Sequence, residues 1–171
     1  MSINLIACCD LNRAIGYQGK LLTRLPKDLK RFKELTTNNF IVMGRRTYQE
    51  IGEPLPNRTN LILSKSGDFD FHQDLYVYNS AESILQEYYD HADEDAQLYV
   101  CGGEQVYNCF MPHADKIYLT IVSHKFENAD TYFSTDSLDD FKITSYVKHK
   151  ADNNHPYDYA FVEYTRGKRG E

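Results

Sequence analysis

Short runs of apolar, β-favouring residues recur along the chain, and stretches with helical spacing separate most of them. Residues 3–9 are β-rich, and residues 40–43 are continuously apolar, which is typical of strands covered on both faces. Parallel strands need long, usually helical, crossover connections, so this alternation predicts an α/β fold with a mostly parallel sheet. The strands expected in this part of the chain are residues 3–9, 40–43, 60–64, 75–78, 97–101 and 116–122.

The pattern changes towards the C-terminus. Residues 141–150 and 157–164 alternate enough to predict a closing antiparallel pair, with residues 151–156 as the connection. We also expect a loop over residues 69–74 and a loose tail over residues 166–171. Helices are expected over residues 25–36, shortly after residue 44, over residues 80–89 and over residues 104–110.

Composition excludes several classes of protein. The chain has 171 residues and a net charge of −6, so general nucleic-acid binding is not expected. It contains no apolar run long enough to span a membrane and no basic N-terminal signal region. The cysteines lack C-x-x-C or zinc-like spacing, which predicts reduced thiols in a cytoplasmic protein. They are Cys8, Cys9, Cys101 and Cys109.

One acidic residue interrupts an apolar helix face. Within residues 25–36, Leu25, Phe32 and Leu35 recur with Leu29 at helical spacing, and Asp28 falls on the same face. One interpretation is an ordinary first-turn acid that the helix dipole favours. The other is a pocket carboxylate that awaits a hydrogen-bonding ligand, because an unpaired charge on an apolar face is costly.

Glycines, hydroxyls and basic residues follow three of the expected strands, where ligands gather in open α/β sheets. Backbone N–H groups, helix dipoles and guanidinium groups at such positions favour a phosphate, although two solvated arginines or a tight glycine turn are alternatives. The ordinary G-x-G-x-x-G fingerprint is absent. The three segments are Gly44-Arg45-Arg46-Thr47, Ser64-Lys65 and Gly102-Gly103.

Residues 10–24 are expected to form a long loop between the first strand and the Asp28 helix. Long loops inside compact domains are often functional, so this segment is a candidate lid. A plain surface loop is the alternative.

The ordered set of these short motifs resembles the dihydrofolate reductase family over about residues 3–165. The matching segments, in the order of that family, are Ile6-Ala7, Ala14-Ile15-Gly16, Leu25-Pro26-x-Asp28-Leu29-x-x-Phe32, Met43-Gly44-Arg45-x-Thr47, Ile51-Gly52-x-Pro54-Leu55-Pro56-x-Arg58, Gly102-Gly103-x-x-Val106-Tyr107, Tyr118-Leu119-Thr120 and Asp130-Thr131-x-Phe133. The resemblance implies a single domain over residues 1–171. Its central mixed, mostly parallel sheet would have about eight strands, an antiparallel C-terminal edge and helices on both faces.

The resemblance also implies an activity: NADPH-dependent hydride transfer that reduces 7,8-dihydrofolate to 5,6,7,8-tetrahydrofolate, for one-carbon metabolism and thymidylate synthesis. Asp28 would be the catalytic residue: its carboxylate would bind the amino group and a ring nitrogen of the pterin, supported by a hydrogen bond from Thr120. Arg58 would hold the glutamate carboxylate of folate. The apolar slot for the rings would be lined by Ile6, Leu29, Phe32, Ile51 and Leu55.

The cofactor would bind at the strand ends and under the lid. Arg45, Arg46 and Thr47, with Ser64 and Lys65, would take the phosphates, and Gly102 and Gly103 would hold the pyrophosphate. The full set implied for the cofactor is Cys8, Ala14, Ile15, Gly16, Lys20, Leu21, Gly44, Arg45, Arg46, Thr47, Ser64, Lys65, Cys101, Gly102, Gly103, Glu104, Gln105, Val106 and Tyr107.

Two positions depart from the family pattern. Thr23 stands where the family usually has a tryptophan, and this chain has no tryptophan. Cys101 replaces a larger aliphatic residue, which implies an altered affinity for the antifolate trimethoprim. A monomer that antifolates inhibit is expected by resemblance. The reductase of riboflavin synthesis and a non-catalytic pterin or nucleotide-binding protein are the competing interpretations, although Asp28 and Arg58 favour folate.

Overall fold

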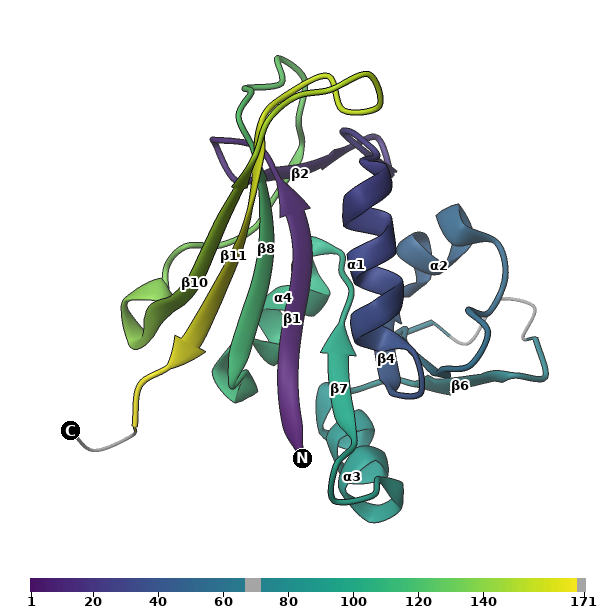
Figure 1. The fold of residues 1–171 in the computed structure, drawn as a ribbon. Coiled ribbons are helices and arrows are strands. Elements are labelled where there is room, and N and C mark those ends of the chain that lie inside the picture. The colour runs from purple at the N-terminus through teal and green to yellow at the C-terminus, as the bar shows by residue number, and fades with distance from the viewer. Residues whose placement is uncertain (67–71, 169–171) are drawn as a thin grey trace.

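The computed structural model describes residues 1–66 and 72–168, and its central feature is a twisted sheet (Figure 1). In chain order its strands are β1 (Ser2–Cys9), β4 (Phe40–Gly44), β5 (Thr59–Leu63), β6 (Leu75–Tyr78), β7 (Gln97–Val100), β8 (Lys116–Val122), β10 (Phe141–His149) and β11 (Tyr159–Arg166). The spatial order is β10-β11-β8-β1-β7-β4-β5-β6. Only the β8–β11 and β10–β11 ladders of this sheet are antiparallel among the described residues. The predicted mostly parallel sheet with an antiparallel C-terminal edge is therefore confirmed.

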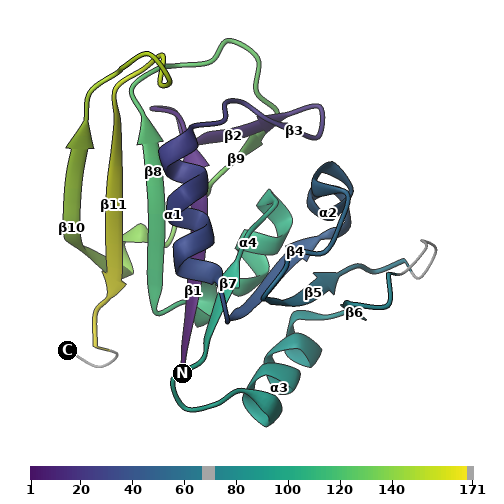
Figure 2. The ribbon, with the colours of Figure 1, turned by 45° about the vertical axis from the view of Figure 1, so that its right-hand side comes forward.

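Helices cover both faces of the sheet, as expected. On one face α3 (Ala81–His91) and α4 (Glu104–Phe110) pack against alternate residues of β1, such as Leu5. On the other face α1 (Pro26–Thr36) and α2 (Arg45–Ile51) contribute Leu35 and Tyr48 to a second apolar cluster. Figures 1 and 2 show α1 and α4 on opposite sides of β1. Two short 3-10 turns, η1 (Met111–His113) and η2 (Leu138–Asp140), complete the helical segments described.

The sheet opens between β1 and β7 at the carboxyl ends of these strands. Their pairing runs from Ser2–Gln97 to Leu5–Val100, whereas β1 continues along β8 as far as the pair Cys9–Ile121. Beyond Leu5, the carbonyl oxygen of Ile6 accepts a hydrogen bond from the hydroxyl of Tyr107 at 2.7 Å. A side chain thus satisfies a buried backbone group where the strands part, as the buried backbone requires.

Residues 10–24 are not the continuous loop that was expected. They contain β2 (Ala14–Tyr17) and β3 (Lys20–Leu21), which form a small sheet with β9 (Thr131–Tyr132) in the order β3-β2-β9. Strands of four and two residues are too short for a periodic pattern, and the pairing depends on a segment more than a hundred residues away. The prediction of a plain coil was therefore wrong for these residues.

The last strand ends later than predicted. The predicted tail began at Arg166, but Arg166 ends β11 and its guanidinium donates to the carbonyl oxygens of Ala114 at 2.6 Å and Met111 at 2.7 Å. The rest of that prediction over residues 169–171, and the expected loop over residues 69–71, lie outside the described residues. In the described part of the chain no helix combines the length and hydrophobicity needed to cross a membrane.

Candidate active site

Asp28 lies in the first turn of α1, at the face that α1 turns towards the sheet. The hydroxyl of Thr120 on β8, itself 2% exposed, donates a hydrogen bond to Asp28 Oδ1, so the expected contact is present. Burial raises the pKa of the Asp28 carboxyl above its usual range, while the Thr120 hydrogen bond and the charge of Arg31 oppose this rise. Such a carboxyl gains from a ligand that supplies hydrogen-bond donors, because these favour its charged form.

Arg31 is a site residue that the sequence reasoning missed. Its guanidinium lies 3.3 Å from Glu163 Oε1 on β11 and 4.4 Å from the centre of the Phe161 ring. These contacts hold a positive charge one turn after Asp28 on α1. The sequence shows that Arg31 follows Asp28 by three residues. It does not show that Glu163 and Phe161 on β11 hold the Arg31 side chain in place.

The apolar residues expected to line a substrate slot divide into two groups. Ile6 and Leu55 are partly buried and pack against the same apolar cluster as Cys101. Leu29 on α1 and Ile51 on α2 are 46% and 38% exposed, although α1 and α2 cover the same face of the sheet. The apolar stripe of residues 25–36 therefore does not pack wholly into the core: Leu25, just before α1, is buried, but Leu29 beside Asp28 is exposed to solvent. Exposed apolar side chains next to a partly buried acid are suited to a ligand with a polar edge and an apolar ring.

Arg58 lies at the far end of α1. Its Nε donates to the carbonyl oxygen of Pro56 at 2.8 Å, and its Nη1 donates to Thr36 Oγ1 at 3.2 Å. Thr36 is the last residue of α1, so Asp28 and Arg58 mark the two ends of one helix. Two hydrogen bonds fix the guanidinium and leave it able to pair with an anion.

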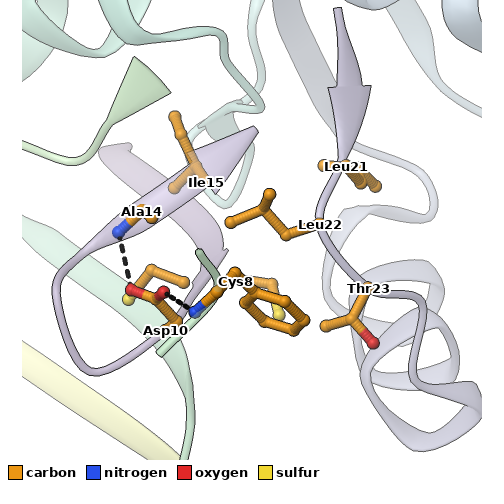
Figure 3. A pocket seen from close by; sticks show the side chains of 9 residues that line it. Cys8, Asp10, Ala14, Ile15, Leu21, Leu22 and Thr23 are labelled. Carbon is orange, nitrogen blue, oxygen red and sulfur yellow. Dashed lines mark hydrogen bonds between the residues drawn. The ribbon is translucent and has the colours of Figure 1, made fainter. Parts of the chain in front are cut away.

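A small pocket lies beneath the segment that carries β2 and β3 (Figure 3). Figure 3 shows Leu22 reaching between Ile15 and Cys8, with Thr23 beside it. Asp10 anchors this segment, because Asp10 Oδ1 accepts the N–H of Ala14 at 2.9 Å and Oδ2 accepts the N–H of Phe126 at 2.9 Å. The residues that line the pocket are Cys8, Cys9, Asp10, Ala14, Ile15, Leu21, Leu22, Thr23 and Phe126.

The pocket brings together some of the residues that the resemblance implies for the cofactor. Cys8, Ala14, Ile15 and Leu21 belong to the set expected to bind the cofactor, whereas Phe126 was not singled out, because its loop is remote in sequence. Hydrogen bonds also join the β2–β3 segment to residues before β9. The N–H of Gln18 donates to Asp130 Oδ2 at 2.9 Å, and the N–H of Asp130 donates to the carbonyl oxygen of Gly16 at 3.0 Å.

The glycines and basic residues after the strands converge at one edge of the sheet. The parallel strands β7, β4 and β5 are neighbours, so the segments after their carboxyl ends are adjacent (Figure 2). The N–H of Gly44 donates to the carbonyl oxygen of Gly102 at 2.8 Å, and Arg45 Nη1 donates to Ser66 Oγ at 3.0 Å. Gly44 and Gly103 immediately precede α2 and α4, so two helix N-termini meet here.

Space is restricted around these glycines. A Cβ atom on Gly44 would lie 3.1 Å from Val106 Cγ2, and one on Gly103 would lie 3.8 Å from Thr47 Oγ1. Gly102 has φ +109°, and a Cβ atom there would approach the Tyr107 hydroxyl at 3.1 Å. The positive φ thus favours glycine at Gly102, and all three glycines leave the backbone bare, which allows a phosphate to approach its N–H groups.

The thiols of Cys8, Cys9 and Cys101 are not suited to nucleophilic chemistry. Burial raises the pKa of Cys8 well above its usual value, that of Cys9 to about 11 and that of Cys101 to about 12. Protonated thiols are poor nucleophiles and poor metal ligands. Among residues 1–66 and 72–168 no group of His, Cys, Asp and Glu side chains could hold a metal ion.

Comparison with known proteins identifies the family. A family model described as dihydrofolate reductase matches residues 2–166. Dihydrofolate reductase of Bacillus subtilis (strain 168) is 36% identical over 164 residues, covering 96% of this chain and 94% of the relative. That of Staphylococcus haemolyticus is 34% identical over 166 residues, covering 97% of this chain and 96% of the relative.

A solved structure agrees with these sequence matches. Dihydrofolate reductase from Enterococcus faecalis, complexed with NADP(H) and RAB-propyl, has a TM-score of 0.89 and 32% sequence identity. The match covers 98% of this chain and 97% of that one. With a partly buried acid on α1, bare glycines at two helix starts and matches of this extent, the chain belongs to the dihydrofolate reductase family.

Proposed function

We propose that the residues of α1 and of the strand ends catalyse the reaction of the family, the NADPH-dependent reduction of 7,8-dihydrofolate to 5,6,7,8-tetrahydrofolate. The observation that carries this proposal is Asp28: a carboxylate with a raised pKa, hydrogen-bonded to Thr120 and flanked by exposed Leu29. A dihydropterin ring has the matching features, with adjacent N–H donors on one edge and an apolar face. The competing substrate, a ribose-phosphate pyrimidine, has no need of an acid in this position.

Asp28 binds and orients the substrate in this proposal. Thr120 donates to one carboxylate oxygen, and the ionised group has further acceptor positions for the amino group and ring nitrogen of the pterin. Pairing at low dielectric is strong and directional, so it fixes the ring in the slot. Asp28 polarises the ring and raises the basicity of nitrogen-5, to which solvent delivers the proton. The thiol of Cys8 stays protonated, so it cannot serve as a base.

The residues lining the slot and its far end fix the rest of the substrate. Ile6, Leu29, Phe32, Ile51 and Leu55 would contact the pterin and aminobenzoate rings. Arg58, held by Pro56 and Thr36, would pair with the glutamate carboxylate. Asp28 and Arg58 stand at opposite ends of the eleven-residue helix α1, which suits an elongated ligand with a polar group at each end.

The edge of the sheet at the carboxyl ends of β7, β4 and β5 fits a dinucleotide. The bare backbone at Gly44 and Gly103, the starts of α2 and α4, and the arginines of α2 suit a pyrophosphate and a ribose phosphate. Arg45, Arg46, Thr47, Ser64 and Lys65 would hold the phosphates. When bound, NADPH supplies the hydride, and the chain aligns the two rings and excludes water. Leu21, Leu22 and Phe126 over the pocket supply that exclusion.

Further properties follow as proposals. Antifolates should bind the same slot, with trimethoprim affinity altered because Cys101 is smaller than the usual residue of the family. We also propose that the enzyme is a monomer, that residues 1–171 form one domain and that the enzyme acts in the cytoplasm without nucleic-acid or membrane partners. Reduced thiols agree with that location, since all four cysteines are free in the described structure.

The test is turnover. Purified protein is mixed with NADPH and dihydrofolate, and the absorbance of NADPH is followed with and without methotrexate. We expect rapid oxidation that methotrexate stops. Binding of both ligands without oxidation would instead favour a pterin-binding protein. A failure to bind dihydrofolate would favour the reductase of riboflavin synthesis.

A further inference from the structure

Helix α1 has an unusual start. The residue before it, Leu25, has a side chain that cannot accept a hydrogen bond, and Pro26 occupies the first helical position. Proline suits that position, but the N–H groups that follow still need partners. The helix that carries Asp28 therefore begins without the Ser, Thr, Asp or Asn that usually caps such a helix.

A histidine from the other end of the chain supplies the missing acceptor. The backbone N–H of Lys27 donates to His155 Nε2 at 3.2 Å. His155 lies in the connection between β10 and β11 and is 3% exposed. Figures 1 and 2 show the tip of this hairpin above the start of α1. Lys27 directly precedes Asp28, so the contact is made in the turn that positions the acid.

The hairpin holds His155 in the required orientation. Asp152 Oδ1 accepts from His155 Nδ1 at 2.8 Å and from the N–H of Asn154 at 2.9 Å. With its proton on Nδ1, the neutral ring presents Nε2 as an acceptor. The ring also stacks on Tyr159, with centroids 5.0 Å apart, and Tyr159 packs with Leu25 in one apolar cluster.

Two segments next to β11 therefore contact Asp28 and its helix: β8, which pairs with β11, and the connection before β11, which carries His155. Thr120, which bonds Asp28, pairs with Phe161, and Val122 pairs with Tyr159 two residues away. Thr120 holds the Asp28 carboxylate, and His155 holds the backbone of the first turn of α1. A shift of the turn would misalign the carboxylate from any ligand that it pairs with.

We propose that His155 is a positioning residue of the active site: its neutral imidazole caps α1 and holds Asp28 in register for the pterin. This inference rests on the proposed role of Asp28. It gives the β10–β11 hairpin a part in substrate affinity, although the hairpin contributes no residue to the expected slot.

Two substitutions separate the hydrogen bond that caps α1 from the stacking of His155 on Tyr159. His155→Gln keeps an acceptor near the position of Nε2 but loses the aromatic ring, whereas His155→Phe keeps the ring and loses the acceptor. We expect His155→Phe to weaken dihydrofolate binding roughly three- to tenfold, and His155→Gln to remain within about twofold of wild type. The dissociation constant of NADPH, measured in the same titrations, should stay unchanged in both variants and thereby show that they are folded. If His155→Gln weakened dihydrofolate binding and His155→Phe did not, packing of the ring alone would matter, and the proposal would be overturned.

A double-substitution cycle tests whether His155 acts through Asp28. Dihydrofolate affinity is measured for wild type, Asp28→Asn, His155→Phe and the double variant. We expect the effect of His155→Phe to fall below about twofold once Asp28 is replaced, because the group that it positions is gone. An equal effect in both backgrounds would refute the positioning role. If Asp28→Asn itself bound dihydrofolate normally, the proposed function of Asp28 would fail, independently of what His155→Phe does in the wild-type background.

Discussion

Replacing Thr120 by valine removes the hydroxyl that bonds Asp28 while keeping the shape of a side chain that is 2% exposed. Valine is close to threonine in volume, so the cost comes from the lost hydrogen bond rather than from a cavity. A hydrogen bond to a charged group contributes about 1.5–3 kcal/mol. For a chain of 171 residues, this corresponds to a Tm lowered by roughly 3–12 °C.

The loss should depend on pH, and its sign follows from the pKa of Asp28. Because that pKa is raised in the folded protein, the contribution of Asp28 to stability is complete below its unfolded pKa and declines as the pH rises through its folded pKa. Valine removes a group that lowers the folded pKa, so the pKa rises further. The difference in Tm between variant and wild type should therefore be smaller at acidic pH and grow as the pH rises past the wild-type pKa of Asp28.

Thermal unfolding followed by circular dichroism from acidic to alkaline pH measures this difference. Thr120→Ser keeps the hydroxyl and serves as the matched control, which should show a smaller loss with little dependence on pH. A Tm difference for Thr120→Val that is the same at every pH would refute the reasoning, since the hydroxyl would then not act on the charge of Asp28.

Three further substitutions test other parts of the site. Gly102→Ala forces a side chain onto φ +109° and against the Tyr107 hydroxyl at 3.1 Å, so we expect a Tm loss of several degrees and weaker NADPH binding in calorimetry. An unchanged Tm would show that the backbone there tolerates a side chain. Arg58→Met should raise KM for dihydrofolate by roughly tenfold or more and leave a pterin without glutamate unaffected; equal effects on both substrates would remove Arg58 from glutamate binding. Arg31→Gln removes a charge that lowers the pKa of Asp28, so the acidic limb of the kcat/KM profile should move to higher pH. A profile that stays in place would exclude this influence.

Much of the fold is readable from the sequence because the interior strands and crossover helices have strong, regular patterns. The apolar run at residues 40–43 became β4, and the helix expected over residues 80–89 became α3, which Ser80 caps by accepting the N–H of Ser83 at 3.1 Å. The short strands β2 and β3 were not predicted, because they are too short for a periodic pattern and β2 pairs with β9, which is remote in sequence. The spatial order of the strands in the sheet was not predicted, because it depends on how the segments pack together and not on the sequence of any single segment.

The candidate site was readable where one residue conflicts with its surroundings. Asp28 conflicts with an apolar helix face, and the structure provides the hydrogen bond that resolves the conflict. Arg31, Phe126 and His155 carried no such signal, because their importance comes from partners far away in the sequence. His155 contacts a backbone group 128 positions earlier, and no local pattern encodes that distance. The roles of the cofactor-binding residues stay predictions that ligand binding must test.

The most direct measurement is a kinetic comparison of wild type with Asp28→Asn at neutral pH. Steady-state assays give kcat and KM for dihydrofolate, and fluorescence titration gives the dissociation constant of NADPH. The account predicts that Asp28→Asn loses most of its turnover, binds NADPH as wild type does and is more stable at neutral pH, since a costly buried charge is removed. Turnover equal to that of wild type would contradict the claim that Asp28 binds and orients the pterin.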